Sequence, residues 1–177
     1  MKTVRASFAI AVIIAVTLFV NSCKKEKDPG FGNITVSLID SPGVYQQVNV
    51  DIQKVSVHLV PTAGSASWID LPTKSGIYNL LKLQNGIDTS LVNTTALAAG
   101  KITQMRLILG TKNTVMVNSV VYDLTVPSGT DTGIKLIGNL TVDPSQPLKV
   151  VLDFNADASV VLIGTNTYQL KPTIKTL

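Results

Sequence analysis

The chain has 177 residues, a formal net charge of +4 and a single cysteine. Without residues 1–22 the charge falls to +2, and residues 28–177 hold ten basic and ten acidic side chains. A neutral body with one arginine, Arg106, argues against a nucleic-acid-binding domain, which carries a basic patch. No second cysteine exists to form an internal disulfide.

The amino-terminal segment has the pattern of a secretory signal. Lys2 and Arg5 precede an uncharged apolar run of 13 residues, 8–20. A membrane-spanning helix needs about 20 such residues, whereas the apolar core of a signal peptide needs about 7–15. We therefore predict that residues 1–22 are a signal peptide, cleaved between Ser22 and Cys23.

Cys23 follows Val20-Asn21-Ser22, which is similar to the lipid-attachment box of bacterial lipoproteins. We predict that Cys23 is lipidated and that residues 23–31 form a tether. The alternative is an ordinary secretory signal with a chance cysteine beside its cleavage site. Two or three acyl chains anchor a protein stably, so the expected location is a membrane, most simply the outer membrane of a Gram-negative bacterium. Either leaflet of this membrane, periplasmic or surface-facing, is compatible with the sequence.

Apolar and polar residues alternate with a period of two through most of residues 32–177, and turn-forming residues separate the alternating runs. Many strands and almost no helical pattern predict a single all-β domain. We expect a Greek-key β-sandwich, immunoglobulin- or prealbumin-like, with at most one short helix. The apolar strand positions are Ile34, Val36 and Leu38; Val48, Val50 and Ile52; Met105, Leu107 and Leu109; Val120, Tyr122, Leu124 and Val126; Leu148, Val150, Leu152 and Phe154; and Tyr168, Leu170 and Ile174.

The second strand changes phase. Its apolar positions are even at first and then odd: Val48, Val50 and Ile52, followed by Val55, Val57 and Leu59. A strand cannot change parity without turning its core residues toward solvent. We predict a bulge or sharp bend near Gln53 and Lys54.

A short helical turn is expected at residues 88–98. Asp88 is a possible N-cap there, and Gly100 would end the turn before the next strand.

Three features could belong to a ligand-binding site, and each also has a purely structural interpretation. The sole histidine, His58, lies on the polar side of a strand, where a surface role is the simpler interpretation. The sole tryptophan, Trp68, is either a sugar-stacking platform or a packing residue. The small, polar segment 127–133 is either a ligand loop or a plain hairpin connection.

Two further sets of polar residues carry specific hypotheses. Oxygen ligands at alternate positions Asp153, Asn155 and Asp157 could bind calcium if the chain curls into a loop. We favour a strand end with Asx turns, since the glycine and glutamate of a calcium loop are absent. Arg106 is expected to form a structural ion pair with Asp40 or Asp153.

Several segments occur in an order that resembles one bacterial lipoprotein family, catalogued as domain of unknown function 4382. They are Ser37-Leu38-Ile39-Asp40-Ser41-Pro42, the region of Trp68, residues 78–86, 100–107, 126–133 and 153–160, and Tyr168-Gln169-Leu170-Lys171-Pro172. The resemblance runs from about Gly32 to Ile174. It implies an exported, lipid-anchored β-sandwich and no known catalysis, so no catalytic residue and no cofactor are inferred from it.

The expected function is a non-catalytic binding or display role in the cell envelope, with a glycan or a surface protein as partner. The alternative is a structural or adhesin- or fimbria-associated subunit, which requires an exposed strand edge. A hydrolase using Asp40, Asp51 and Asp153 is less favoured, because acid–base catalysis needs carboxylates that converge.

Overall fold

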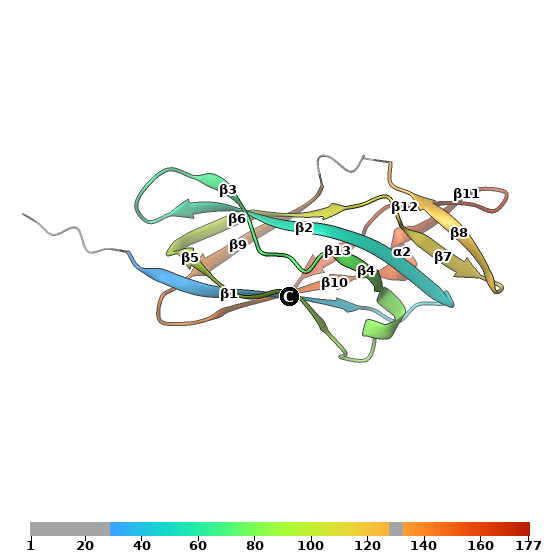
Figure 1. The fold of residues 1–177 in the computed structure, drawn as a ribbon, viewed down its shortest axis with the longest axis horizontal. Helices are drawn as coiled ribbons and strands as arrows, with labels where there is room; N and C mark the ends of the chain where they lie inside the picture. Colours follow the sequence, from blue (N-terminus) through green and yellow to red (C-terminus); the bar gives the residue numbers. More distant parts are fainter. Residues whose placement is uncertain (1–28, 128–132) are drawn as a thin grey trace, which may run out of the picture.

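In the part of the chain that the structure describes, the protein is mostly β, as predicted, and consists of two mixed sheets and one short α-helix (Figure 1). The structure, a computed structural model, describes residues 29–127 and 133–177. The elements are β1 (Phe31–Asp40), β2 (Gln47–Pro61), β3 (Ser67–Asp70), β4 (Gly76–Asn79), the 3-10 helix η1 (Leu80–Leu83), β5 (Thr89–Ala98), β6 (Gly100–Leu109), β7 (Thr114–Val117), β8 (Val120–Thr125), β9 (Ile134–Val142), β10 (Leu148–Phe154), α2 (Ala156–Ser159), β11 (Val160–Gly164), β12 (Thr167–Leu170) and β13 (Ile174–Thr176).

The smaller sheet has four strands in the order β13-β10-β1-β5. β1 lies in its interior, parallel to β10 and antiparallel to β5. Parallel strands cannot be joined by a tight hairpin, and the long segment between β1 and β10 supplies the connection that their parallel pairing requires.

The larger sheet has the order β11-β12-β8-β7-β2-β6-β9, and β3 and β4 also pair with β2. The 15-residue strand β2 organises this sheet. Its first part pairs with β7 and β4, and its second part pairs with β6 and β3. On one side of β2, a gap therefore separates the end of β6 from the start of β7.

The phase change in β2 is a bulge at the predicted place. The pairing register between β2 and β6 shifts between Ile52 and Lys54. Ile52 before the shift and Val55 after it are both fully buried, whereas Gln53 and Lys54 are exposed. The bulge keeps one face of β2 in the core along its whole length, which confirms the prediction.

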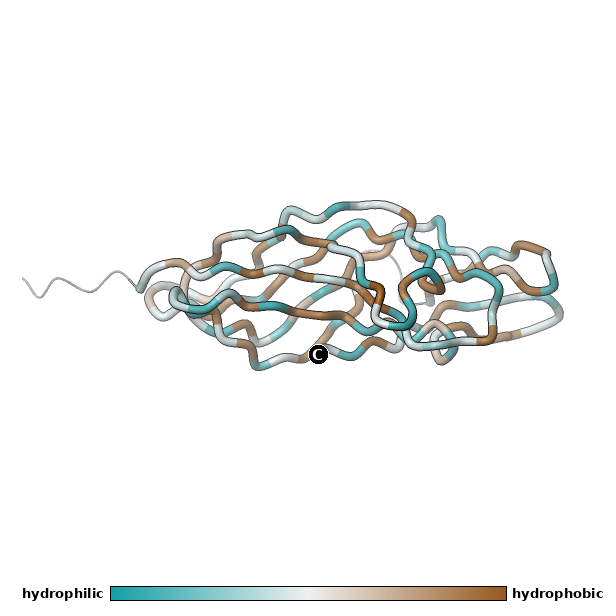
Figure 2. Tube along the Cα trace, turned by 90° about the horizontal axis from the view of Figure 1, so that it is seen from below, coloured by the Kyte–Doolittle hydropathy of each residue, from teal (hydrophilic) through white to brown (hydrophobic). Residues whose placement is uncertain are grey.

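Buried apolar residues from both sheets form one hydrophobic cluster. Figure 2 shows hydrophobic and hydrophilic residues alternating along the strands, as expected when one face of each sheet is buried. The largest fully buried side chains include Phe154, Ile34, Leu38 and Leu152 of the smaller sheet and Ile52, Met105 and Leu107 of the larger one.

The helical turn expected at residues 88–98 is wrong, because Thr89–Ala98 is strand β5 and pairs with β1. Its threonines are β-branched and favour a strand. The helical turns lie elsewhere: η1 is capped by the Asn79 side chain and α2 by the Asn155 side chain.

The molecule is elongated, and its two ends differ (Figure 1). The first strand, β1, begins at one end, and the β7–β8 and β11–β12 hairpins lie at the opposite end. No helix within residues 29–127 and 133–177 has the length and apolar character needed to cross a membrane.

Candidate functional site

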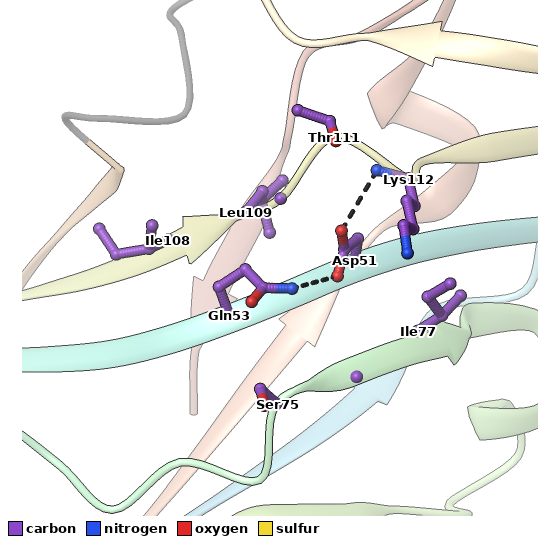
Figure 3. Close-up of a pocket in the computed structure, with 10 residues that line it drawn as sticks. Asp51, Gln53, Ser75, Ile77, Ile108, Leu109, Thr111 and Lys112 are labelled. Atoms are coloured by element: carbon purple, nitrogen blue, oxygen red, sulfur yellow. Dashed lines mark hydrogen bonds between the residues drawn. The ribbon is translucent and has the colours of Figure 1, made fainter.

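One candidate site is a hollow of about 640 Å³ beside the gap between β6 and β7 (Figure 3). It lies on the outer face of the larger sheet, where the polar side chains of β2 point away from the core. Its walls combine polar groups with two isoleucines: Asp51, Gln53, Ser75, Gly76, Ile77, Ile108, Leu109, Gly110, Thr111 and Lys112.

Asp51 lies at the centre of this hollow and is only 5% exposed. Its carboxylate accepts hydrogen bonds from the side-chain amide of Gln53 and from the backbone N–H of Lys112, the latter at 3.2 Å. Hydrogen bonds to a buried carboxylate offset part of the cost of removing it from water. Asp51 is therefore a satisfied structural group that fixes one wall of the hollow.

The loop that closes the gap is held by Asn113, which is 1% exposed. Its side chain accepts from Asp51 N at 2.9 Å and donates to Gly110 O at 2.8 Å. Gly110 N in turn donates to Asp51 O at 2.7 Å. A Cβ atom at position 110 would overlap the Asp51 carboxylate, so only glycine lets the loop approach this closely.

A second hollow, of about 720 Å³, lies on the other side of the same loop. It shares Gly110, Thr111 and Lys112 with the first and extends along β7 and β8. The segment 110–112 thus forms a rim between two concave, solvent-accessible surfaces.

Farther along β2, the outer face carries an aromatic and cationic group. Trp68 pairs with His58 across β3 and β2, and their ring centroids are 5.3 Å apart. The guanidinium carbon of Arg106, on β6, lies 3.8 Å from the centre of the Trp68 ring. His58 also contacts Thr103 through Nδ1 at 2.8 Å, so the histidine is a packed surface residue.

The neighbouring carboxylate, Asp70, forms an ion pair with Lys54. It accepts from Lys54 Nζ at 2.6 Å and from Ser56 Oγ at 2.6 Å. The hydrogen bond from Lys54 is the main reason why the pKa of Asp70 lies below its ordinary value, and the bond from Ser56 acts in the same direction.

The structure does not form the predicted ion pair of Arg106 with Asp40 or Asp153. Arg106 stacks on Trp68 instead. Asp40 accepts from Gln84 Nε2 at 3.0 Å and from Ala156 N at 2.8 Å, and Asp153 accepts from Ser41 Oγ. The prediction fails because the two carboxylates belong to the smaller sheet and are bound there by other donors.

Burial raises the pKa of Asp40, and the nearby charges of Asp153 and Asp157 act in the same direction. The hydrogen bonds from Gln84 and Ala156 oppose this shift. Asp40 and Asp153 therefore lie in one neighbourhood, whereas Asp51 has a separate set of partners on β2 and the 110–113 loop. The three carboxylates of the hydrolase hypothesis do not share one set of contacts.

Each of the three candidate calcium ligands accepts a hydrogen bond from another residue of the protein. Asp153 accepts from Ser41, Asn155 accepts from Ala158 N at 2.8 Å, and Asp157 accepts from Val44 N at 3.1 Å. In the part of the chain that the structure describes, no three His, Cys, Asp or Glu side chains are grouped so as to hold a metal ion. Asn155 caps α2, which is the Asx arrangement that the sequence favours.

Several predicted features lie outside the described residues: the cleavage site at Ser22, the lipidation site Cys23, and residues 128–132 of the polar segment 127–133. Conversely, the sequence did not indicate Gly110, Lys112 and Asn113 as site residues, and it indicated Gln53 only as part of the bulge. The one signal for the first three was the interruption of strand alternation at residues 110–113, Gly-Thr-Lys-Asn, between two apolar runs.

The chain belongs to a family described only as a domain of unknown function (DUF4382), which matches residues 31–172. This confirms the family resemblance of the sequence. No curated protein and no solved structure matches the chain significantly.

Proposed function

We propose that this is an exported, lipid-anchored envelope protein with a non-catalytic binding role, and that it binds a glycan on the outer face of its larger sheet. The observation that carries the proposal is the hollow beside Asp51, with its rim fixed by Gly110 and Asn113. A site whose walls are held in place before a ligand arrives loses little conformational entropy on binding.

The chemistry of the hollow suits a hydroxyl-rich ligand. Gln53, Ser75, Thr111 and Lys112 supply side-chain donors and acceptors, while Ile77 and Ile108 supply apolar surface for the carbon face of a sugar ring. Its volume lies within the range of about 300–1,000 Å³ of small-molecule sites.

A blocking substitution tests this site. Thr111 is exposed on the rim of both hollows, so Thr111→Phe should occlude them without disturbing the core. Thr165→Phe places the same aromatic on the exposed β11–β12 turn and serves as the control. Full-length protein in detergent is assayed on a glycan array. The proposal requires that binding is lost in Thr111→Phe and kept in Thr165→Phe; silence of the parent across all glycans counts against it.

The location is proposed from the sequence: residues 1–22 as signal peptide, Cys23 as the lipidated residue, residues 23–31 as tether and residues 32–177 as one domain in the outer membrane of a Gram-negative bacterium. Mass spectrometry of the mature amino terminus tests lipidation directly. Cys23→Ala should move the protein from the membrane fraction to the soluble fraction. Proteolysis of intact cells then distinguishes the surface from the periplasmic leaflet.

We also propose that the two sheets have Greek-key, immunoglobulin- or prealbumin-like connectivity. The pairing of the first strand, β1, with the late strand β10 across most of the chain supports this type of topology. An experimental structure that departs from the strand order β13-β10-β1-β5 would overturn it.

A second candidate is a structural or adhesin-associated subunit. It is favoured by β11, which is an edge strand without any charged residue, Val160–Gly164, and which exposes 60% of Leu162. Such an edge can accept a strand from another chain. Cross-linking of intact cells should then give a complex that Leu162→Lys abolishes; monomers alone would remove this candidate.

A further inference from the structure

We propose that the glycan is acidic and that its carboxylate binds between Arg106 and Lys135, beside Trp68. This inference deepens the proposed function and rests on glycan binding at the outer face of the larger sheet. It assigns the ligand class and a second contact region, next to the hollow.

The register of β6 and β9 places two positive charges side by side. Arg106 is directly opposite Lys135 in the ladder. Like charges in that relation destabilise a sheet. Among the described residues, the ion pair that forms is Lys54 with Asp70, and neither Arg106 nor Lys135 has a carboxylate within 4.0 Å. A bound anion between the two cations would turn this repulsion into attraction.

Arg106 is held by stacking and not by hydrogen bonds. Its guanidinium lies over the Trp68 ring, and its Nε is buried without a hydrogen-bond partner. A buried donor left unpaired is costly in a folded protein. Stacking on Trp68 orients the planar guanidinium before a ligand binds. Guanidinium groups recognise carboxylates through paired hydrogen bonds.

The surroundings favour a sugar over a bare anion. Trp68 and His58 lie on one side of Arg106, and Ile137, which is 90% exposed, lies on β9 close to Lys135. These apolar and aromatic surfaces suit the faces of sugar rings. Along β6, Ile108 is two residues from Arg106, a rise of about 7 Å, and Ile108 already lines the hollow beside Asp51. The charged site and the hollow are therefore consecutive along the same strands.

The test compares acidic oligosaccharides with their neutral forms. Oligomers of galacturonic, mannuronic and glucuronic acid, and their methyl esters, are titrated into full-length protein in detergent. We expect at least one free acid to bind about tenfold more tightly than its ester, a difference of about 1.4 kcal/mol, because the free acid makes a hydrogen-bonded charge contact that the ester lacks. Added salt should reduce this difference.

Three variants locate the contact. Lys135 is exposed, so Lys135→Gln should fold normally and weaken binding of the free acid by about tenfold while leaving the ester unchanged. Arg106→Lys keeps the charge but loses the planar fork, and it should also weaken the free acid. Lys149→Gln removes an exposed charge from β10 of the smaller sheet and should change neither.

The outcomes separate this inference from the proposed function. Equal binding of acid and ester, or an unchanged affinity in Lys135→Gln, would overturn the acidic-glycan assignment while glycan binding stands. Equal affinity for poly-glutamate would show charge attraction without sugar recognition and would also overturn it. Absence of binding to every glycan would overturn both proposals.

Discussion

Two buried aspartates, Asp40 and Asp51, have similar exposure and similar hydrogen bonds but lie among different neighbours. Each is 5% exposed, and each accepts from one glutamine side chain and one backbone N–H. Asp40 ends β1 in the smaller sheet, near two other carboxylates, Asp153 and Asp157. Asp51 lies in β2, beside the loop that bridges β6 and β7.

The comparison shows that the neighbours of a buried carboxylate decide its role. The charges around Asp40 add to burial and raise its pKa, so this side chain couples the end of β1 to pH. Asp51 instead positions a loop and shapes a solvent-accessible hollow. One carboxylate tunes stability, and the other fixes the form of the candidate site.

The largest effect is expected for Gly110→Ala, which inserts a methyl group into the Asp51 carboxylate. Either the carboxylate or the loop must move, so unfolding free energy should fall by about 3 kcal/mol. Chemical denaturation measures this. Gly164→Ala is the control, since the added atom meets only the Thr167 side chain at 3.7 Å. Equal stability of the two variants would mean that the loop is not held against Asp51.

Asp51→Ala should cost somewhat less, about 2 kcal/mol, because the Lys112 N–H loses its acceptor and the Gln53 amide loses its partner. The same denaturation assay applies, and the proposed glycan binding should weaken with it. Asp51→Asn keeps an acceptor and should lose less. If both variants match the parent, Asp51 is not what holds the wall of the hollow.

A smaller effect, visible as a change with pH, is expected for Asp40→Asn. The folded-state pKa of Asp40 is raised above 3.8, so its protonated form favours folding. That contribution is complete below pH 3.8 and is lost as pH rises through the folded pKa. The stability of the parent relative to Asp40→Asn should therefore decline across this window, measured by thermal melting at several pH values.

Asp143→Asn is the control for the pH experiment, and the pH dependence expected for its stability difference from the parent has the opposite sign. A hydrogen bond from the Ser145 side chain lowers the pKa of the exposed Asp143. Stability relative to Asp143→Asn should therefore fall as pH decreases. Identical pH profiles for the two variants would contradict the different surroundings of the two aspartates.

The smallest effect is expected for Lys54→Ala, which removes the exposed ion pair with Asp70. Solvent screens such pairs, so the change in unfolding free energy should be about 0.5 kcal/mol or less. A loss of more than about 1 kcal/mol would show that this pair also supports the stacked Trp68 and Arg106.

The strands were largely predictable because alternation is local. The parity change between Ile52 and Val55 required a bulge, and the bulge is present. The site was not predictable in the same way. Asp51 and Lys112 are 61 residues apart, and their contact depends on how β6 and β7 flank β2.

The errors have the same origin. Arg106 was expected to pair with a carboxylate, but the register of three strands places Trp68 beside it. Residues 88–98 carry a plausible cap, yet pairing with β1 provides a partner that a local helix pattern does not reveal. Sequence shows which residues prefer a strand, whereas register is set by the whole sheet.

The interior position of β1 has a mechanical consequence. Seven residues of β1 pair with β10 on one side, and seven pair with β5 on the other. A pull on the amino-terminal end of β1, directed along the strand, loads both ladders in shear, so many hydrogen bonds must break together. An edge strand pulled sideways would unzip one bond at a time. We therefore expect the amino-terminal end of the domain to resist tension along β1.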